Sequence, residues 1–187
     1  MEQTNIKKTA DSLENIFLIG FMCSGKTSAG ALLAKKLKRK FKDSDAELEK
    51  TYKKSPAKII KKKGIRYFRV LEEKTVKKII KEKNIIIAMG GGIMASKKWN
   101  KYLKDKGSSV YLSCSIEELK KRLLKTKEDR PLIGKGSGKE IGLKTKELLA
   151  KRAPYYNKAN FKLSVTKLTP AQTAKKIERI IKTPEAG

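Results

Sequence analysis

Short apolar runs alternate along the chain with longer stretches in which apolar residues recur every three or four positions. The short runs are typical of β-strands and the longer stretches of amphipathic helices. The expected strands are Ile16–Ile19, a short segment ending near Asp43, Asn84–Met89, Ser109–Cys114 and Phe161–Val165. This alternation predicts βα units, and therefore an α/β fold with a mostly parallel sheet.

The amphipathic stretches also carry helix start signals. Ser55 followed by Pro56 is typical of an N-cap with proline in the first turn, and Ser115 with Glu118 has the spacing of a capping box. The expected helices are Lys26–Lys40, Ala46–Lys54, Pro56–Lys63, Tyr67–Lys83, Ser96–Lys106, Ile116–Lys125, Lys144–Lys158 and Ala171–Ile181.

The expected elements occupy residues 15–182, and a chain of 187 residues suits a single domain. Residues 1–14 are polar and lack the apolar segment of an export signal, so we expect a flexible N-terminal extension. Residues 183–187 are expected to form a C-terminal tail. The glycine-rich stretch Glu128–Glu140 has few apolar residues, which predicts a mobile lid at about 127–140.

The chain carries 47 Lys and Arg against 19 Asp and Glu, a formal net charge of +28. Lysines are spread over nearly every expected helix and aromatic residues are sparse, so no nucleic-acid platform is visible and we expect no specific nucleic-acid partner. With no histidine and two cysteines, a Cys/His zinc site and a histidine triad are excluded. We expect a cytoplasmic monomer that does not enter membranes, because no apolar run approaches the roughly 20 residues of a span.

The segment Gly20–Thr27 matches the phosphate-loop pattern G-x-x-x-x-G-K-[ST], between an apolar strand and an amphipathic helix. Its glycines let backbone N–H groups cradle phosphate oxygens, Lys26 reaches the β- and γ-phosphates, and the Thr27 hydroxyl suits Mg²⁺. The ATP-binding residues expected here are Gly20, Cys23, Ser24, Gly25, Lys26, Thr27 and Ser28. The motif alone does not separate a kinase from another nucleotide hydrolase.

Two aspartates, Asp43 and Asp45, follow the second expected strand, at the edge of a parallel sheet where ligands bind. Alternation along a strand would point both carboxylates to one side. One is then expected to hold the metal through water, and the other to accept a hydrogen bond from a substrate hydroxyl. The alternative is a turn or a helix N-cap, which aspartate also favours.

Arginine is scarce beside lysine, so each arginine is a candidate for recognising a carboxylate or phosphate. Arg69 lies three residues before Glu72, which places both on one helix face; a surface ion pair is the alternative. Arg130 opens the expected lid, and Arg152 precedes a helical proline that is expected to kink the chain. The triplet 90–92 of three glycines ends an apolar strand and admits a ligand close to the backbone.

In this order, these motifs resemble shikimate kinases over nearly the whole chain. The resemblance rests on the phosphate loop, Asp43-x-Asp45, Phe68-Arg69 with Glu72, Gly90-Gly91-Gly92, Arg130-Pro131-Leu132 and Arg152-x-Pro154-x-Tyr156. It implies a three-layer αβα P-loop kinase fold with a five-stranded parallel sheet in order 2-3-1-4-5 and a mobile lid. It also implies transfer of the γ-phosphate of ATP, with Mg²⁺, to the shikimate 3-hydroxyl, in the pathway to chorismate and the aromatic amino acids.

The same resemblance implies roles for individual residues. Asp45 would hold the ring hydroxyls and act as base, Arg69 and Arg152 would bind the carboxylate, and Gly90, Gly91 and Gly92 would border the acceptor. Thr27 and Asp43 would support Mg²⁺, Lys26 and Arg130 would act on the phosphates, and Arg122 and Pro170 would flank the adenine. Cys23 stands where the family usually has glycine or alanine, and a side chain of its size is expected to fit. The alternatives are a gluconate or nucleoside-monophosphate kinase, or a nucleic-acid-binding protein that retains a phosphate loop.

Overall fold

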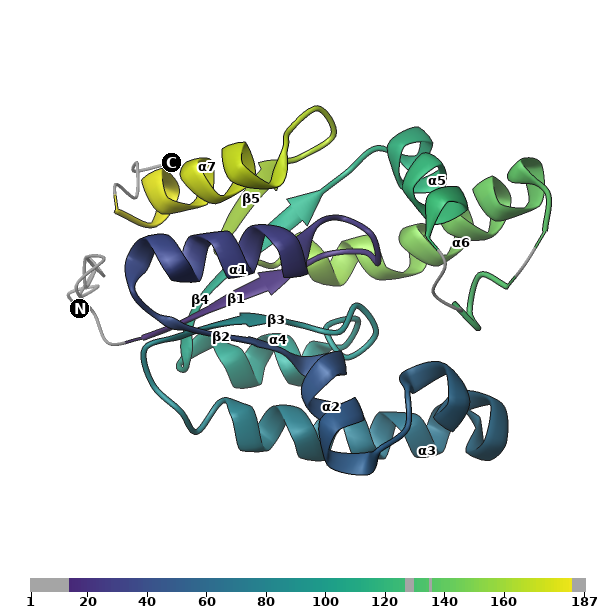
Figure 1. The fold of residues 1–187 in the computed structure, drawn as a ribbon, viewed down its shortest axis with the longest axis horizontal. Helices are drawn as coiled ribbons and strands as arrows, with labels where there is room; N and C mark the ends of the chain where they lie inside the picture. Colours follow the sequence, from purple (N-terminus) through teal and green to yellow (C-terminus); the bar gives the residue numbers. More distant parts are fainter. Residues whose placement is uncertain (1–13, 127–129, 135, 183–187) are drawn as a thin grey trace, which may run out of the picture.

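A five-stranded parallel sheet lies between two layers of helices in the computed structural model, which describes residues 14–126, 130–134 and 136–182 (Figure 1). The strands are β1 (Asn15–Ile19), β2 (Lys40–Asp43), β3 (Ile85–Ala88), β4 (Gly107–Ser113) and β5 (Phe161–Ser164). They pair in the order β2-β3-β1-β4-β5, and every pair is parallel. The predicted α/β architecture and strand order are confirmed.

The helices cover both faces of this sheet, with α1 and α7 on one side and α3 and α4 on the other (Figure 1). Their bounds are α1 (Lys26–Leu37), α2 (Ser44–Tyr52), α3 (Pro56–Ile79), α4 (Lys97–Lys104), α5 (Ile116–Lys125), α6 (Gly138–Tyr156) and α7 (Pro170–Lys182). Among the described residues, no helix is both long and apolar enough to cross a membrane.

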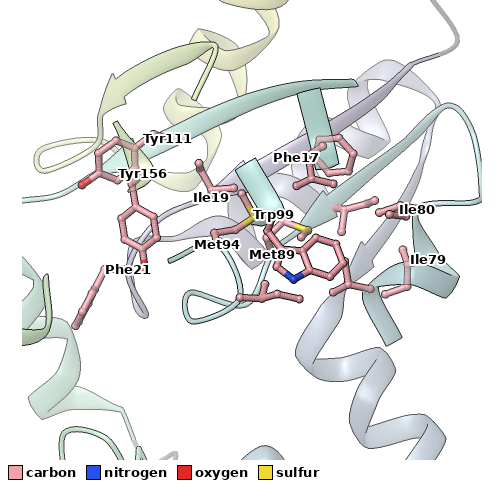
Figure 2. Packing of buried hydrophobic residues seen from close by; sticks show 14 of the residues in the cluster. Phe17, Ile19, Phe21, Ile79, Ile80, Met89, Met94, Trp99, Tyr111 and Tyr156 are labelled. Atoms are coloured by element: carbon pink, nitrogen blue, oxygen red, sulfur yellow. The ribbon is translucent and has the colours of Figure 1, made fainter. Parts of the chain in front are cut away.

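The central strand β1 divides its side chains between two cores. Phe17 and Ile19 belong to a cluster with residues of α3 and α4, in which Trp99 lies close to methionines that follow β3 (Figure 2). Ile16 and Leu18 face the opposite cluster, which includes Leu33 of α1. A strand buried on both faces needs this continuous apolar sequence, and it holds the loop that follows it in a fixed place.

Helix α1 lies unusually close to the sheet. A Cβ atom at Gly30 would stand 2.5 Å from the Phe41 ring and 2.9 Å from a methyl group of Leu18. Because only glycine fits there without displacing these side chains, α1 packs closely on β1 and β2. This close packing positions the loop between β1 and α1.

Several predicted boundaries are wrong. The first helix ends at Leu37, since Lys38 adopts a left-handed conformation and Lys40 already pairs in β2. Helix α6 begins at Gly138, inside the stretch predicted to be a loop, because Ser137 and Glu140 form a capping box. The remainder of the predicted lid includes residues 127–129 and 135, which lie outside the described residues. The two helices predicted on either side of Gly64 form one element, α3, broken at that glycine.

Candidate active site

The loop between β1 and α1 has the backbone that a phosphate-binding loop requires. Gly20 and Gly25 have φ angles of 148° and 92°, and a Cβ atom at Gly20 would meet the Leu112 carbonyl oxygen at 2.7 Å. The Lys26 ammonium folds back over the loop and donates to the carbonyls of Gly20 and Phe21, at 3.0 and 2.8 Å. The Ser24 hydroxyl is buried and finds no hydrogen-bond partner within the described part of the chain, so it is available to a phosphate oxygen.

The protonation state of Lys26 depends on whether phosphate is bound. Burial lowers the pKa of its ammonium to about 8, and the nearby carboxylates of Asp43 and Asp45 oppose this shift. A phosphate group beside Lys26 adds negative charge and therefore favours the protonated form. The loop thus holds a buried ammonium group whose protonated form is stabilised when an anion binds.

Thr27 and Asp43 meet at the carboxyl edge of the sheet. The Thr27 hydroxyl donates to one carboxylate oxygen of Asp43 at 2.6 Å, and the other oxygen accepts from the backbone N–H of Asp45 at 2.9 Å. Asp43 is therefore the N-cap of α2, and Asp45 lies in the first helical turn. The expectation that strand alternation aligns the two carboxylates is wrong, because the strand ends at Asp43. Hydroxyl and carboxylate oxygens are nevertheless the hard donors that suit Mg²⁺.

Asp45 faces the space between several cations. Burial raises the pKa of its carboxyl, and Asp43 acts in the same direction, while Lys26, Arg130 and Arg69 oppose the shift. A carboxyl group with a raised pKa accepts a proton more readily than an exposed aspartate does. Its position near the phosphate loop suits a general base.

Two arginines of different helices converge near Asp45. Arg69 of α3 forms an ion pair with Glu72, whose side chain is only 2% exposed. Burial raises the pKa of Glu72 to about 7, and Arg69 counteracts the rise. Arg152 of α6 is 6% exposed, and its guanidinium lies 5.8 Å from the centre of the Phe21 ring. Two such guanidinium groups suit a carboxylate ligand.

The three glycines after β3 make room for these side chains. A Cβ atom at Gly92 would stand 2.0 Å from the Arg69 guanidinium, and one at Gly90 would stand 2.4 Å from Glu72. The Gly90 N–H donates to the buried Ser44 hydroxyl at 2.8 Å. The triplet therefore packs against the protein's own charged groups, which the sequence prediction of close ligand approach did not include.

The predicted residues line two adjoining cavities. We call the larger one, of about 920 Å³, the phosphate-loop cavity. Of the predicted residues, it is lined by Cys23, Ser24, Gly25, Lys26, Thr27, Ser28, Asp43, Asp45, Gly91, Arg122, Arg130 and Pro170. The second, which we call the arginine cavity, is lined by Asp45, Arg69, Glu72, Gly91, Gly92, Arg130 and Arg152. Asp45, Gly91 and Arg130 border both, whereas Gly20 and Gly90 border neither.

Arg122 reaches the phosphate loop from α5. One of its terminal nitrogens donates to the Cys23 carbonyl at 3.2 Å, and its Nε donates to Glu118 at 2.8 Å. Arg122 and Pro170 both line the phosphate-loop cavity.

Apolar residues of both cavities escaped the sequence prediction. Met22, Pro56 and Ala57 line both cavities, Ile60 lines the arginine cavity, and Leu168 lines the phosphate-loop cavity. An apolar side chain facing a cavity follows the same periodicity as one facing the core, so the pattern carries no signal that separates the two.

A phosphate loop at the carboxyl end of the central strand, beside a threonine–aspartate pair and a cavity with two arginines, defines a P-loop kinase. Residues 22–182 match the family model described as shikimate kinase. The chain is 36% identical to a shikimate kinase of Persephonella marina, covering 88% of this chain and 97% of that protein. It is 41% identical to one of Thermodesulfovibrio yellowstonii, over 88% and 93%. The chain belongs to the shikimate kinase family.

The structural comparison agrees. A structure of shikimate kinase from Acinetobacter baumannii in complex with shikimate matches with a TM-score of 0.83 and 31% identity, covering 94% of this chain and 97% of that one. The protein is therefore a phosphotransferase with a P-loop kinase fold.

Proposed function

We propose that this enzyme transfers the γ-phosphoryl group of ATP to the 3-hydroxyl of shikimate, giving shikimate 3-phosphate and ADP. The observation that carries the proposal is the arginine cavity, where Arg69 and Arg152 adjoin the phosphate loop through Asp45. Two forked guanidiniums suit the acceptor's carboxylate, and a carboxylate base suits its hydroxyls. Gluconate and nucleoside monophosphates do not offer this combination on one ring.

The acceptor side of the reaction follows from these positions. Arg69 and Arg152 bind the carboxylate, and the Gly91 N–H contacts a ring hydroxyl, with Gly90 and Gly92 bordering the pocket. Asp45 accepts the proton of the 3-hydroxyl while the oxygen of that hydroxyl forms a bond to the γ-phosphorus. The bond between that phosphorus and the β,γ-bridging oxygen breaks, and ADP leaves with the electron pair.

The nucleotide side is arranged around the phosphate loop. The backbone of Gly20–Ser28 and the Ser24 hydroxyl hold the phosphates, with Lys26 and Arg130 neutralising the charge that moves to the bridging oxygen. Arg122 and Pro170 flank the adenine. Thr27 and, through water, Asp43 would hold Mg²⁺, which supplies charge neutralisation on the β- and γ-phosphates when bound.

Other parts of the proposal concern the whole molecule. We assign the activity to a single domain at 15–182. The predicted N-terminal extension apart from Glu14, part of the predicted lid at about 127–140, and the predicted C-terminal tail lie outside the described residues. The enzyme acts as a cytoplasmic monomer on small molecules, with no specific nucleic-acid partner.

The test is ADP release from ATP and Mg²⁺ with purified protein, measured with shikimate, gluconate, CMP or AMP as acceptor. Release that depends on shikimate alone supports the proposal. Turnover with CMP or AMP would keep the P-loop kinase fold but remove the role of the arginines in binding a carboxylate. Turnover with gluconate, itself a carboxylate, would overturn shikimate as the acceptor. RNA binding that survives physiological salt would support the alternative of a nucleic-acid-binding protein.

A further inference from the structure

Tyr156 closes α6 inside the protein, next to the arginine cavity. Its side chain is fully buried, and its hydroxyl donates to the Gly91 carbonyl at 2.5 Å. Arg152 lies one turn earlier on the same face of the helix. A Cβ atom at Gly91 would stand 3.2 Å from the Tyr156 hydroxyl and 3.3 Å from a guanidinium nitrogen of Arg152. The peptide of Gly91 is therefore held against both side chains at once.

Tyr156 remains a hydrogen-bond donor throughout the working pH range. Burial raises the pKa of its hydroxyl to about 12, while Arg152 acts in the opposite direction through its positive charge and its N–H groups. A neutral phenol keeps its proton for the Gly91 carbonyl. The contact therefore does not depend on pH near neutrality.

The surroundings of Tyr156 reach the phosphate loop. In Figure 2, Tyr156 lies between Tyr111 and Phe21. The Tyr111 ring is tilted by 46° against it, with 5.3 Å between the ring centres. Phe21 belongs to the phosphate loop and packs its ring near the Arg152 guanidinium. Gly91 also faces the phosphate loop: a Cβ atom at Gly91 would stand 3.2 Å from the Gly20 carbonyl oxygen.

We propose that Tyr156 is a positioning residue for the acceptor: it fixes the Gly91 peptide and the Arg152 guanidinium in one arrangement. The inference rests on the proposed function, in which Arg152 binds the acceptor's carboxylate and the Gly91 N–H contacts a ring hydroxyl. The Gly91 carbonyl belongs to the peptide between Gly91 and Gly92, so fixing it restrains the backbone of the residue whose N–H contacts the acceptor. Tyr156 thus sets the distance between the Arg152 guanidinium and the Gly91 N–H, which contact the same acceptor molecule.

The substitution Tyr156→Phe removes one oxygen atom and keeps the ring contacts. Without the hydroxyl, the Gly91 peptide and Arg152 lose their common partner. The expected result is a KM for shikimate raised roughly three- to tenfold, the effect of one hydrogen bond. The KM for ATP is expected to stay within about twofold, because neither Tyr156 nor Arg152 lines the phosphate-loop cavity. KM does not depend on the fraction of folded enzyme, so partial unfolding lowers the measured kcat alone.

Two comparisons separate positioning from general packing. Tyr111→Phe removes the hydroxyl of the other ring in the pair and leaves the Tyr156–Gly91 hydrogen bond in place. It is expected to leave both KM values unchanged. In an Arg152→Lys background, Tyr156→Phe is expected to add little, since a residue that acts through Arg152 shows a non-additive double-mutant cycle.

Equal increases in both KM values, or additive effects in the double variant, would overturn the inference. So would an unchanged KM for shikimate in Tyr156→Phe while the wild type phosphorylates shikimate, a result that leaves the proposed function standing. Absence of shikimate-dependent turnover and of calorimetric shikimate binding in the wild type would instead overturn the proposed function, and the inference with it.

Discussion

One methyl group at Gly92 is expected to disable acceptor binding. A Cβ atom there would stand 2.0 Å from one guanidinium nitrogen of Arg69 and 2.2 Å from its central carbon. The backbone of Gly92 does not have the left-handed φ that excludes other residues. In Gly92→Ala the three nearest atoms to the new Cβ all belong to the Arg69 guanidinium, which must leave its place beside Glu72.

The size of the effect follows from the exposure of the two partners. The Arg69 side chain is 32% exposed and has solvent to move into, whereas Glu72 is 2% exposed and stays. Without Arg69 the pKa of Glu72, already raised to about 7 by burial, rises further and the carboxyl becomes neutral. Loss of one guanidinium from a buried carboxylate contact costs about 2–4 kcal/mol. The KM for shikimate is then expected to rise by roughly 30- to 1,000-fold.

The assay is steady-state ADP release with shikimate and ATP varied in turn. Binding of ADP, measured by calorimetry, is expected to stay unchanged because Arg69 does not line the phosphate-loop cavity. Gly142→Ala on α6 is the matched control, since the Lys120 side chain, at 3.4 Å, is the one group among the described residues that its Cβ atom would meet. That control is expected to keep wild-type kinetics and to gain about 0.5–1 kcal/mol of stability. A Gly92→Ala enzyme whose KM for shikimate stays within about twofold of wild type would refute the reasoning.

Four further predictions address the phosphate side and the base. Asp45→Asn is expected to lower kcat by about 100-fold or more with the fold intact, and near-normal turnover would remove its role as base. Arg130→Ala is expected to lower kcat more than it weakens ADP binding, and the reverse order in kinetics and calorimetry would contradict that role. Because the free Lys26 has a pKa of about 8, the Kd for ATP is expected to rise as pH increases above that value, by up to about tenfold per unit, and a flat profile from pH 7 to 9.5 would refute this. Cys23→Gly is expected to raise the unfolding free energy by up to about 1 kcal/mol, since Cys23 has a φ of 61°, and a lower melting temperature would contradict it.

The sheet was predictable because its signals are local. A run such as Ile85–Met89 identifies a strand buried on both faces. The phosphate-loop motif also indicates the strand before it and the helix after it. The onset of α6 was missed because glycines surround a capping box that spans only Ser137 to Glu140. At Asp43 the helix N-cap, which the sequence analysis kept as an alternative to strand alternation, is the arrangement found, because an aspartate at a strand end is also a favourable N-cap.

Charged residues and glycines of the site could be predicted from the sequence, whereas the apolar residues that shape its walls could not. Arg69 and Arg152 were identifiable because arginine is rare in this chain, but the apolar walls formed by Pro56 and Ile60 were not. Tyr156 was visible only as part of a motif. The partner of its hydroxyl lies 65 residues away in sequence, and such a contact exists only once the fold has formed.

The break in α3 bears on how acceptor preference can change in evolution. Gly64 has φ 81° and ψ 165°. Apart from its chain neighbours and its own helix backbone, no atom of the described residues lies within 4 Å of the place where its side chain would begin. The segment before it lines the arginine cavity with apolar groups, and the segment after it carries Arg69 and Glu72. If the proposed function holds, the apolar residues before Gly64 would shape the acceptor pocket, and Arg69 after it would bind the acceptor's charge. Divergent relatives that accept bulkier acids are expected to differ in residues 56–63 while residues 65–79 stay constant.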